Sequence, residues 1–66
     1  MQVVVNGKAT EVRDGAAVPD VLDQLGLTGQ RLALLLDGEV VRKADFPQTR
    51  LNEGAVVEII QMVGGG

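Results

Sequence analysis

The strongest strand signal in this chain is the stretch AVVEIIQMV at residues 55–63, and three glycines follow it directly at residues 64–66. β-Branched side chains favour strands because they pack well on a pleated surface. Glycine has no Cβ, so a glycine tail can pass through a narrow channel. Three extended residues reach roughly 10 Å at ~3.3–3.6 Å each. We therefore predict one domain over residues 1–63 and a flexible tail at 64–66, and we expect the carboxylate of Gly66 to be the reactive group.

Two hairpins are predicted in the rest of the chain. Residues 3–13 contain a β-branched run, the pair Asn6-Gly7 and a polar return. Residues 31–42 contain an apolar run, the pair Asp37-Gly38 and a second return. A two-residue type I′ turn needs a positive φ at both central residues, and Asn-Gly and Asp-Gly tolerate it best.

One amphipathic helix is predicted between the hairpins, because four apolar residues repeat at the spacing i, i+3, i+4 and i+7: Val18, Val21, Leu22 and Leu25. No Ser, Thr, Asn or Asp side chain is clearly placed to cap its start. Gly26 can take the left-handed position that ends such a helix.

The predicted order is strand, strand, helix, strand, strand, strand. The first and last strands are rich in Val and Ile, which favours central places in a sheet. A crossover through one helix would set these two strands side by side in parallel. We therefore predict an α+β fold of the β-grasp, ubiquitin-like type, with a mixed sheet of four to five strands and one helix packed across it. A ferredoxin-like fold would need a second helix, and an all-β barrel would not need the apolar stripe. Residues 43–50 show no clear periodicity, and Phe46 is expected at an edge of the core.

Composition excludes most classes of enzyme. The chain has no His, Cys, Ser, Tyr or Trp, and its only hydroxyls belong to Thr10, Thr28 and Thr49. Nucleophilic catalysis needs an activated side chain beside a base, acid–base chemistry near neutral pH most often uses His, and zinc prefers Cys and His. A chain of 66 residues with an aliphatic core also has little room for an enclosed ligand pocket. We predict that the protein is not an enzyme, holds no metal and binds no cofactor.

Charge and hydropathy predict the cellular location of the protein and exclude some classes of partner. The formal net charge is −3, so a phosphate backbone is repelled and nucleic-acid binding is disfavoured. The longest apolar run, at residues 32–36, is far shorter than the ~20 residues of a transmembrane helix. The first residues show neither the basic region nor the cleavage site of a signal peptide. We expect a cytoplasmic protein without membrane contact that is a monomer when free.

Several stretches along the chain match one known family. They are Val3-Val4-Val5-Asn6-Gly7, Val21-Leu22, Leu25-Gly26-Leu27, Leu32-Ala33-Leu34, Leu51-Asn52-Glu53-Gly54, Val57-Glu58-Ile59-Ile60 and Val63-Gly64-Gly65-Gly66. In this combination and at this length, the chain resembles the ThiS-type sulfur carriers of thiamine biosynthesis. The diglycine end alone is shared by ubiquitin-like proteins generally. The chain has Asp37 where many members have Asn, and Gly54-Ala55 where many have Gly-Asp, but neither departure touches the tail.

The resemblance implies a defined chemistry at the end of the chain. An E1-like adenylating enzyme of the ThiF type would use its own ATP to convert the carboxylate of Gly66 into an acyl-adenylate. Sulfur from a persulfide donor would then displace AMP. The resulting thiocarboxylate would give its sulfur to the thiazole ring on a ThiG-type thiazole synthase. By the same resemblance, Gly66 is the carrier position, and Gly64 and Gly65 form the tail that threads into the partner.

Strand alternation predicts a docking patch beside the tail. If Val57 and Ile59 face the helix, then Ile60 and Met62 face away from it, and the same reasoning applies to the other strands. The predicted patch consists of Val4, Leu35, Ile60 and Met62. Exposed apolar patches often mark partner sites, although single surface hydrophobes are also common.

Three other functions are compatible with the same tail. A related carrier would supply sulfur for molybdopterin or for tRNA thiolation. A ubiquitin-like modifier would join its terminal carboxylate to a lysine of a target protein. A plain interaction module would carry an inert tail. The tail by itself does not separate these functions from a carrier for thiazole synthesis.

Overall fold

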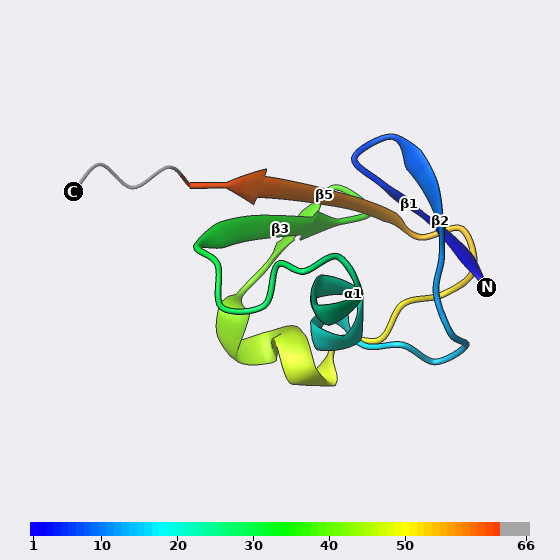
Figure 1. The fold of residues 1–66 in the computed structure, drawn as a ribbon, viewed down its shortest axis with the longest axis horizontal. Coiled ribbons are helices and arrows are strands. Elements are labelled where there is room, and N and C mark those ends of the chain that lie inside the picture. Colours follow the sequence, from blue (N-terminus) through cyan, green and yellow to red (C-terminus); the bar gives the residue numbers. More distant parts are fainter. Residues whose placement is uncertain (63–66) are drawn as a thin grey trace.

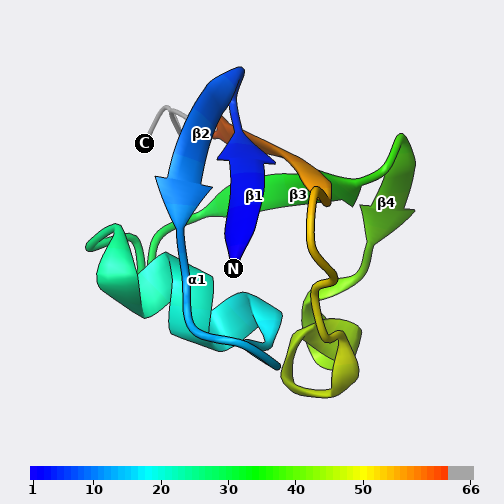
Figure 2. The same ribbon diagram turned by 90° about the vertical axis from the view of Figure 1, so that its right-hand side faces the viewer.

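In the part of the chain that the structure describes, five strands form one mixed sheet, and two helical segments lie against one face of it (Figures 1 and 2). The structure is a computed structural model and describes residues 1–62. In chain order its elements are β1 (Gln2–Val5), β2 (Lys8–Glu11), α1 (Val18–Gln24), β3 (Leu32–Leu36), β4 (Glu39–Val41), the 3₁₀ helix η1 (Lys43–Gln48) and β5 (Val56–Gln61).

The sheet has the order β2-β1-β5-β3-β4, so the last strand lies in its centre. β5 pairs with β1 in parallel and with β3 antiparallel, and the two hairpins form the flanks. This is the predicted β-grasp topology, with five strands. The predicted strand at 55–63 is shorter in the structure: β5 ends at Gln61, and residue 63 lies outside the described part of the chain.

The core lies between the sheet and α1, and strand alternation creates it. Successive strand residues face opposite sides, so each strand contributes every second side chain. The least exposed large side chains are Leu34, Val3, Val18, Val21 and Val57. Phe46, the only aromatic residue, is also buried and packs against this core, as predicted.

Both predicted hairpin turns have the expected backbone. Asn6 and Gly7 have φ angles of 49° and 82°, and Asp37 and Gly38 have 50° and 86°. Positive φ at both central residues is the signature of a type I′ turn, which matches the right-handed twist of the strands it joins.

The helix ends one residue earlier than the apolar stripe suggests. Gly26 has a φ of +74°, its N–H donates to the Asp23 carbonyl at 3.1 Å, and the Leu27 N–H donates to the Leu22 carbonyl at 2.8 Å. These two bonds form a Schellman motif. The prediction that Leu25 joins the buried stripe is wrong, because Leu25 caps the helix and its side chain is 38% exposed.

The start of α1 is held by an acidic side chain from its first turn. Ala17 is the N-cap, and its N–H donates to Asp20 Oδ2 at 2.9 Å. This bond, followed by the bond from the Arg13 guanidinium, holds the pKa of Asp20 below its ordinary value. Asp20 thus supplies one half of a capping box, in which the side chain of the third helical residue accepts a hydrogen bond from the N-cap N–H.

Residues 43–48 form the 3₁₀ helix that periodicity did not predict. Its interior Pro47 has no N–H, and the segment is too short for a 3.6-residue repeat to be recognised. Tertiary contacts explain it, because η1 packs against α1 and buries Phe46.

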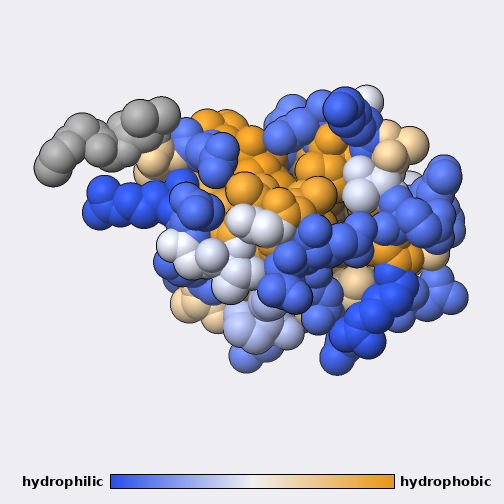
Figure 3. All heavy atoms as spheres, in the orientation of Figure 1, coloured by the Kyte–Doolittle hydropathy of each residue, from blue (hydrophilic) through white to orange (hydrophobic). Residues whose placement is uncertain are grey.

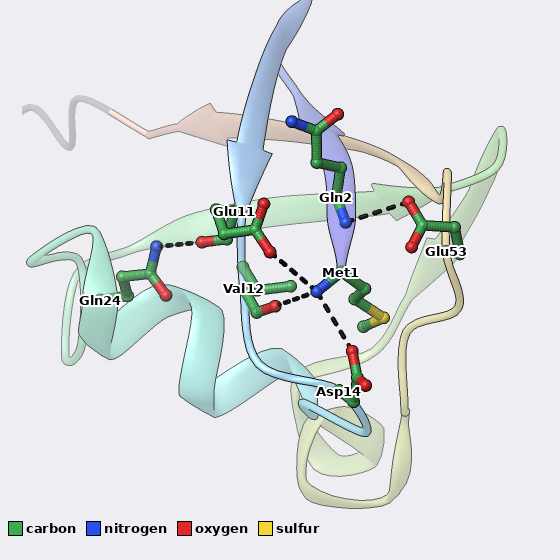
Figure 4. Close-up of polar contacts among 7 residues, drawn as sticks. All are labelled: Met1, Gln2, Glu11, Val12, Asp14, Gln24 and Glu53. Atoms are coloured by element: carbon green, nitrogen blue, oxygen red, sulfur yellow. Dashed lines mark hydrogen bonds and ion pairs between the residues drawn. The ribbon is translucent and has the colours of Figure 1, made fainter.

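The beginning of the chain is anchored by polar contacts, shown in Figure 4. The Met1 ammonium donates to the Val12 carbonyl at 2.7 Å and to Glu11 Oε2 at 2.9 Å, and it lies 3.1 Å from Asp14 Oδ1. These contacts, Glu11 first and then Asp14, raise the pKa of the ammonium group. They hold the start of β1 against the end of β2.

Candidate functional site

The three glycines of the predicted tail, including the predicted carrier residue, lie outside the described residues. Gly64, Gly65 and Gly66 are therefore not placed by the structure. The described part ends at Met62, whose N–H donates to the Arg31 carbonyl at 3.0 Å. This bond continues the pairing of β5 with the chain next to β3, so the base from which the tail leaves is held on one side.

The four residues of the predicted docking patch lie on the sheet face opposite α1. Val4 and Leu35 are half-buried, whereas Ile60 and Met62 are 55% and 56% exposed. The residues next to them that are buried on the helix side are Val3, Val5, Leu34 and Ile59, as the alternation argument requires, whereas Leu36 is half-buried and Gln61 is exposed.

Strand register shows that this patch is divided. Ile60 is opposite Ala33 on β3, and Leu35 is opposite Glu58, so the central position of the open face carries a carboxylate. Val4 is opposite Val56, which is four residues from Ile60, or about 13 Å along a strand at ~3.3 Å per residue. The structure therefore brings Ile60 and Leu35 to adjacent strands and leaves Val4 at the far end.

Two exposed residues that were not predicted extend the open face. Val56 is 46% exposed beside Val4, and Val40 is 71% exposed opposite Leu35. The same alternation along β5 would have included Val56. Val40 follows from the register of a two-residue hairpin, which sets residue 35 against residue 40. We call Val4, Leu35, Val40, Val56, Ile60 and Met62 the outer patch.

Asn6 has a second role that the hairpin motif does not reveal. Its side-chain Oδ1 accepts a hydrogen bond from the Ile59 N–H at 2.8 Å, and its Nδ2 donates to the Ile59 carbonyl at 3.3 Å. The Asn6 side chain thus makes the two hydrogen bonds with the middle of β5 that the backbone of a neighbouring strand would otherwise make. Asp37 does the same at the start of β5, where its Oδ1 accepts from the Val56 N–H at 2.9 Å.

Within residues 1–62, no group of three or more acidic, His or Cys side chains lies together in a way that could hold a metal ion. No helix among these residues is both long enough and apolar enough to cross a membrane. An apolar hollow of about 150 Å³ lies between α1 and η1, lined by Pro19, Leu22 and Phe46, on the helical side and away from the outer patch.

Comparison with known proteins identifies relatives along the whole chain. The model of the ThiS family matches residues 3–66. The sulfur carrier protein ThiS of Thermus thermophilus is 30% identical over 64 residues, which are 97% of this chain and 98% of that protein. The thiazole synthase of Paramagnetospirillum magneticum is 30% identical over 66 residues, all of this chain, and this chain spans 20% of the length of that protein.

Two solved structures from Geobacter metallireducens have the same fold. The crystal structure of its thiamine biosynthesis protein ThiS superposes with a TM-score of 0.81 at 34% identity and covers 100% of both chains. An NMR structure of a thiamine biosynthesis protein gives a TM-score of 0.80 at 30% identity, covering 100% of this chain and 88% of the other. The predicted β-grasp fold is therefore confirmed.

Proposed function

The chain belongs to the ThiS family, the sulfur carriers of thiamine biosynthesis, and we propose that Gly66 is the residue that carries the sulfur. One observation carries this proposal: the family match extends to residue 66 and so includes the three glycines as well as the folded part. Gly64 and Gly65 would then be the segment that threads into a partner, because glycine can pass where a Cβ would collide.

The proposed chemistry takes place on the carboxylate of Gly66. A carboxylate oxygen attacks the α-phosphorus of ATP, and pyrophosphate leaves. The acyl-adenylate that forms has AMP as a good leaving group, which a free carboxylate lacks. A persulfide sulfur then attacks the carbonyl carbon, AMP leaves, and a thiol reductant cleaves the S–S bond to release the thiocarboxylate. ATP, persulfide and reductant all come from partners, so the carrier is their co-substrate and binds no cofactor itself.

Two partner enzymes follow from this chemistry. The first is a ThiF-type adenylating enzyme that supplies the ATP site. The second is a ThiG-type thiazole synthase that accepts the sulfur, and the match to a thiazole synthase supports this acceptor over molybdopterin or tRNA. The outer patch is the proposed docking surface for these partners, because its members Ile60 and Met62 are more than half exposed close to the last described residue. Because the reaction needs ATP, we propose that it takes place in the cytoplasm.

Intact-mass spectrometry tests the proposal directly. The chain is incubated with the adenylating enzyme, ATP, a persulfide donor and a thiol reductant. We expect the mass gain of one oxygen-to-sulfur exchange at Gly66. The matched control is the same chain with its terminal carboxylate converted to an amide, which should remain unchanged because an amide cannot attack ATP in this way.

Two outcomes would contradict a carrier role. Conversion of the amidated chain would show that the sulfur is not carried at the terminus. Covalent adducts joined through Gly66 to lysines of other proteins would instead indicate a ubiquitin-like modifier.

A further inference from the structure

The two edges of β5 differ toward its C-terminal end. On the side of β3, pairing runs from Leu36 opposite Val57 to Leu32 opposite Gln61, and the Met62 N–H adds one more bond. On the side of β1, the last backbone bond runs from the Asn6 N–H to the Val57 carbonyl at 2.9 Å. Figure 1 shows the hairpin of β1 and β2 ending well short of the arrowhead of β5.

The Asn6 side chain extends the β1 side of this ladder by one step, to Ile59. Backbone groups of alternate strand residues face opposite edges. The backbone N–H and C=O groups of even-numbered residues along this segment point toward β3, as the bonds of Val56 and Met62 show. Those of odd-numbered residues point toward β1. The next groups on the β1 edge are therefore the N–H and C=O of Gln61, and no residue from 1 to 62 pairs with them.

A groove lies beside this open edge, on the helix side of the sheet. It has a volume of about 290 Å³, and its apolar lining comes from Val5, Leu25, Leu27 and Ile59. The exposed Leu25 at the end of α1 is part of it. Figure 3 shows apolar atoms gathered on this face of the molecule between the hairpin and the end of β5.

Lys8 also lines the groove and defines its charge. It forms no ion pair with any residue from 1 to 62, and it is a cation in a chain of net charge −3. An occupant of the groove therefore needs a carboxylate close to an apolar side chain.

We propose that the open edge of β5 at Gln61 accepts one extended segment of the adenylating enzyme as an added strand. This strand pairs with the N–H and C=O of Gln61, places an apolar side chain over Leu25 and Ile59, and sets an acidic side chain opposite Lys8. The partner's identity rests on the proposed function. Strand addition at an exposed edge takes its affinity from main-chain bonds and its specificity from alternate side chains.

Proline at residue 61 tests the main-chain bond. Gln61→Pro removes an N–H that has no partner within the described chain, and proline is tolerated where a strand N–H faces outward. The matched control Gln61→Ala keeps the N–H and removes only the side chain. We expect Gln61→Pro to weaken binding to the adenylating enzyme about tenfold, as loss of a main-chain bond predicts, and Gln61→Ala to bind as wild type.

The charge is tested with a second variant that leaves β5 unchanged. Lys8→Glu should weaken binding by a similar factor, and the loss should shrink at high salt because screening reduces repulsion. Lys43→Glu is the matched control, since Lys43 is an exposed lysine at the start of η1 and does not line the groove. Thermal unfolding of each variant checks that the fold is retained.

Binding is measured by calorimetry without ATP, using the wild-type chain and its Gly66 amide as references. Wild-type affinity in both Gln61→Pro and Lys8→Glu would overturn the edge proposal while leaving sulfur transfer intact. Binding that follows the expected pattern without any mass gain at Gly66 would support the edge and overturn the carrier chemistry. Absence of binding by the wild-type chain would overturn both.

Discussion

The two halves of β5 have different surroundings, although they belong to one continuous strand. The first half has hydrogen-bonding neighbours on both edges, from β1 and from β3, with Asp37 closing its start. Among the pairings within residues 1–62, the second half is joined to β3 alone after the Asn6 side chain ends the ladder at Ile59. One strand thus has a first half that is paired on both edges and a second half with one open edge.

This difference determines how easily each half of the strand opens. The amide hydrogens of a strand in the centre of a sheet exchange with solvent only after large-scale unfolding. Exposed strand ends open at a lower free-energy cost. In this chain the change occurs within a few residues, because β1 turns away at Asn6-Gly7 while β5 continues. The length of the first hairpin therefore decides how much of β5 is left open.

The largest effect is expected from a pair of adjacent substitutions. Ile59 is 7% exposed and faces the core, and Ile60 is 55% exposed on the outer patch. Ile59→Ala should lower the free energy of unfolding by about 2–5 kcal/mol through lost burial and a cavity. Ile60→Ala should change it by less than about 0.5 kcal/mol, but should weaken binding to the adenylating enzyme by about 1 kcal/mol or more if the outer patch is the docking surface.

Urea unfolding and calorimetric binding would measure both quantities. Equal stability losses in the two variants would contradict the assignment of faces. Unchanged affinity of Ile60→Ala for the enzyme would remove Ile60 from the docking surface.

A smaller effect is expected from the two turn residues that reach β5. Asn6→Gly keeps the positive φ of the turn but leaves the part-buried Ile59 N–H without its acceptor, which should cost about 1–3 kcal/mol. Asp37→Gly removes an acceptor from the exposed Val56 N–H, which water can replace, and should cost less. Hydrogen exchange should accelerate at Ile59 in the first variant and at Val56 in the second. A larger loss in Asp37→Gly would show that the start of β5, not its middle, limits stability.

The smallest effect is expected from the Met1 ammonium, which anchors β1 beside the first half of β5. Its pKa is raised in the folded state by Glu11 and Asp14, so its contribution is present below its ordinary pKa of about 8 and is lost as pH rises through the folded pKa. The melting temperature should therefore fall above pH 8. Glu11→Gln should reduce this alkaline decline, whereas Glu39→Gln, on the distant β4, should not. An identical alkaline profile in Glu11→Gln and wild type would remove this role from the ammonium group.

Local signals predicted local structure well. Asn6-Gly7 and Asp37-Gly38 predicted two type I′ turns because their backbone requirement belongs to the turn itself. Gly26 predicted the end of α1 for the same reason. The four patch residues were placed on the correct face by alternation, although the docking function of that face stays a prediction.

Features that depend on distant contacts were not predicted. The 3₁₀ helix at residues 43–48 has no period of its own and forms against α1. The bonds of Asn6 to Ile59 join residues 53 positions apart, and no local motif announces them. Leu25 followed the helical period but became exposed because the Schellman turn ends the helix before it.

By itself, the sequence determined the order of the elements, the turn geometry, the alternation of faces and membership of the ThiS family, because each depends on residue types at short spacing or on likeness along the chain. Only the tertiary structure decided that β1 stops beside the middle of β5. It also decided that an amide side chain completes the ladder there and that the edge at Gln61 lies open above an apolar groove. These features arise from the register between strands at opposite ends of the chain, and register becomes visible only when the strands are packed together.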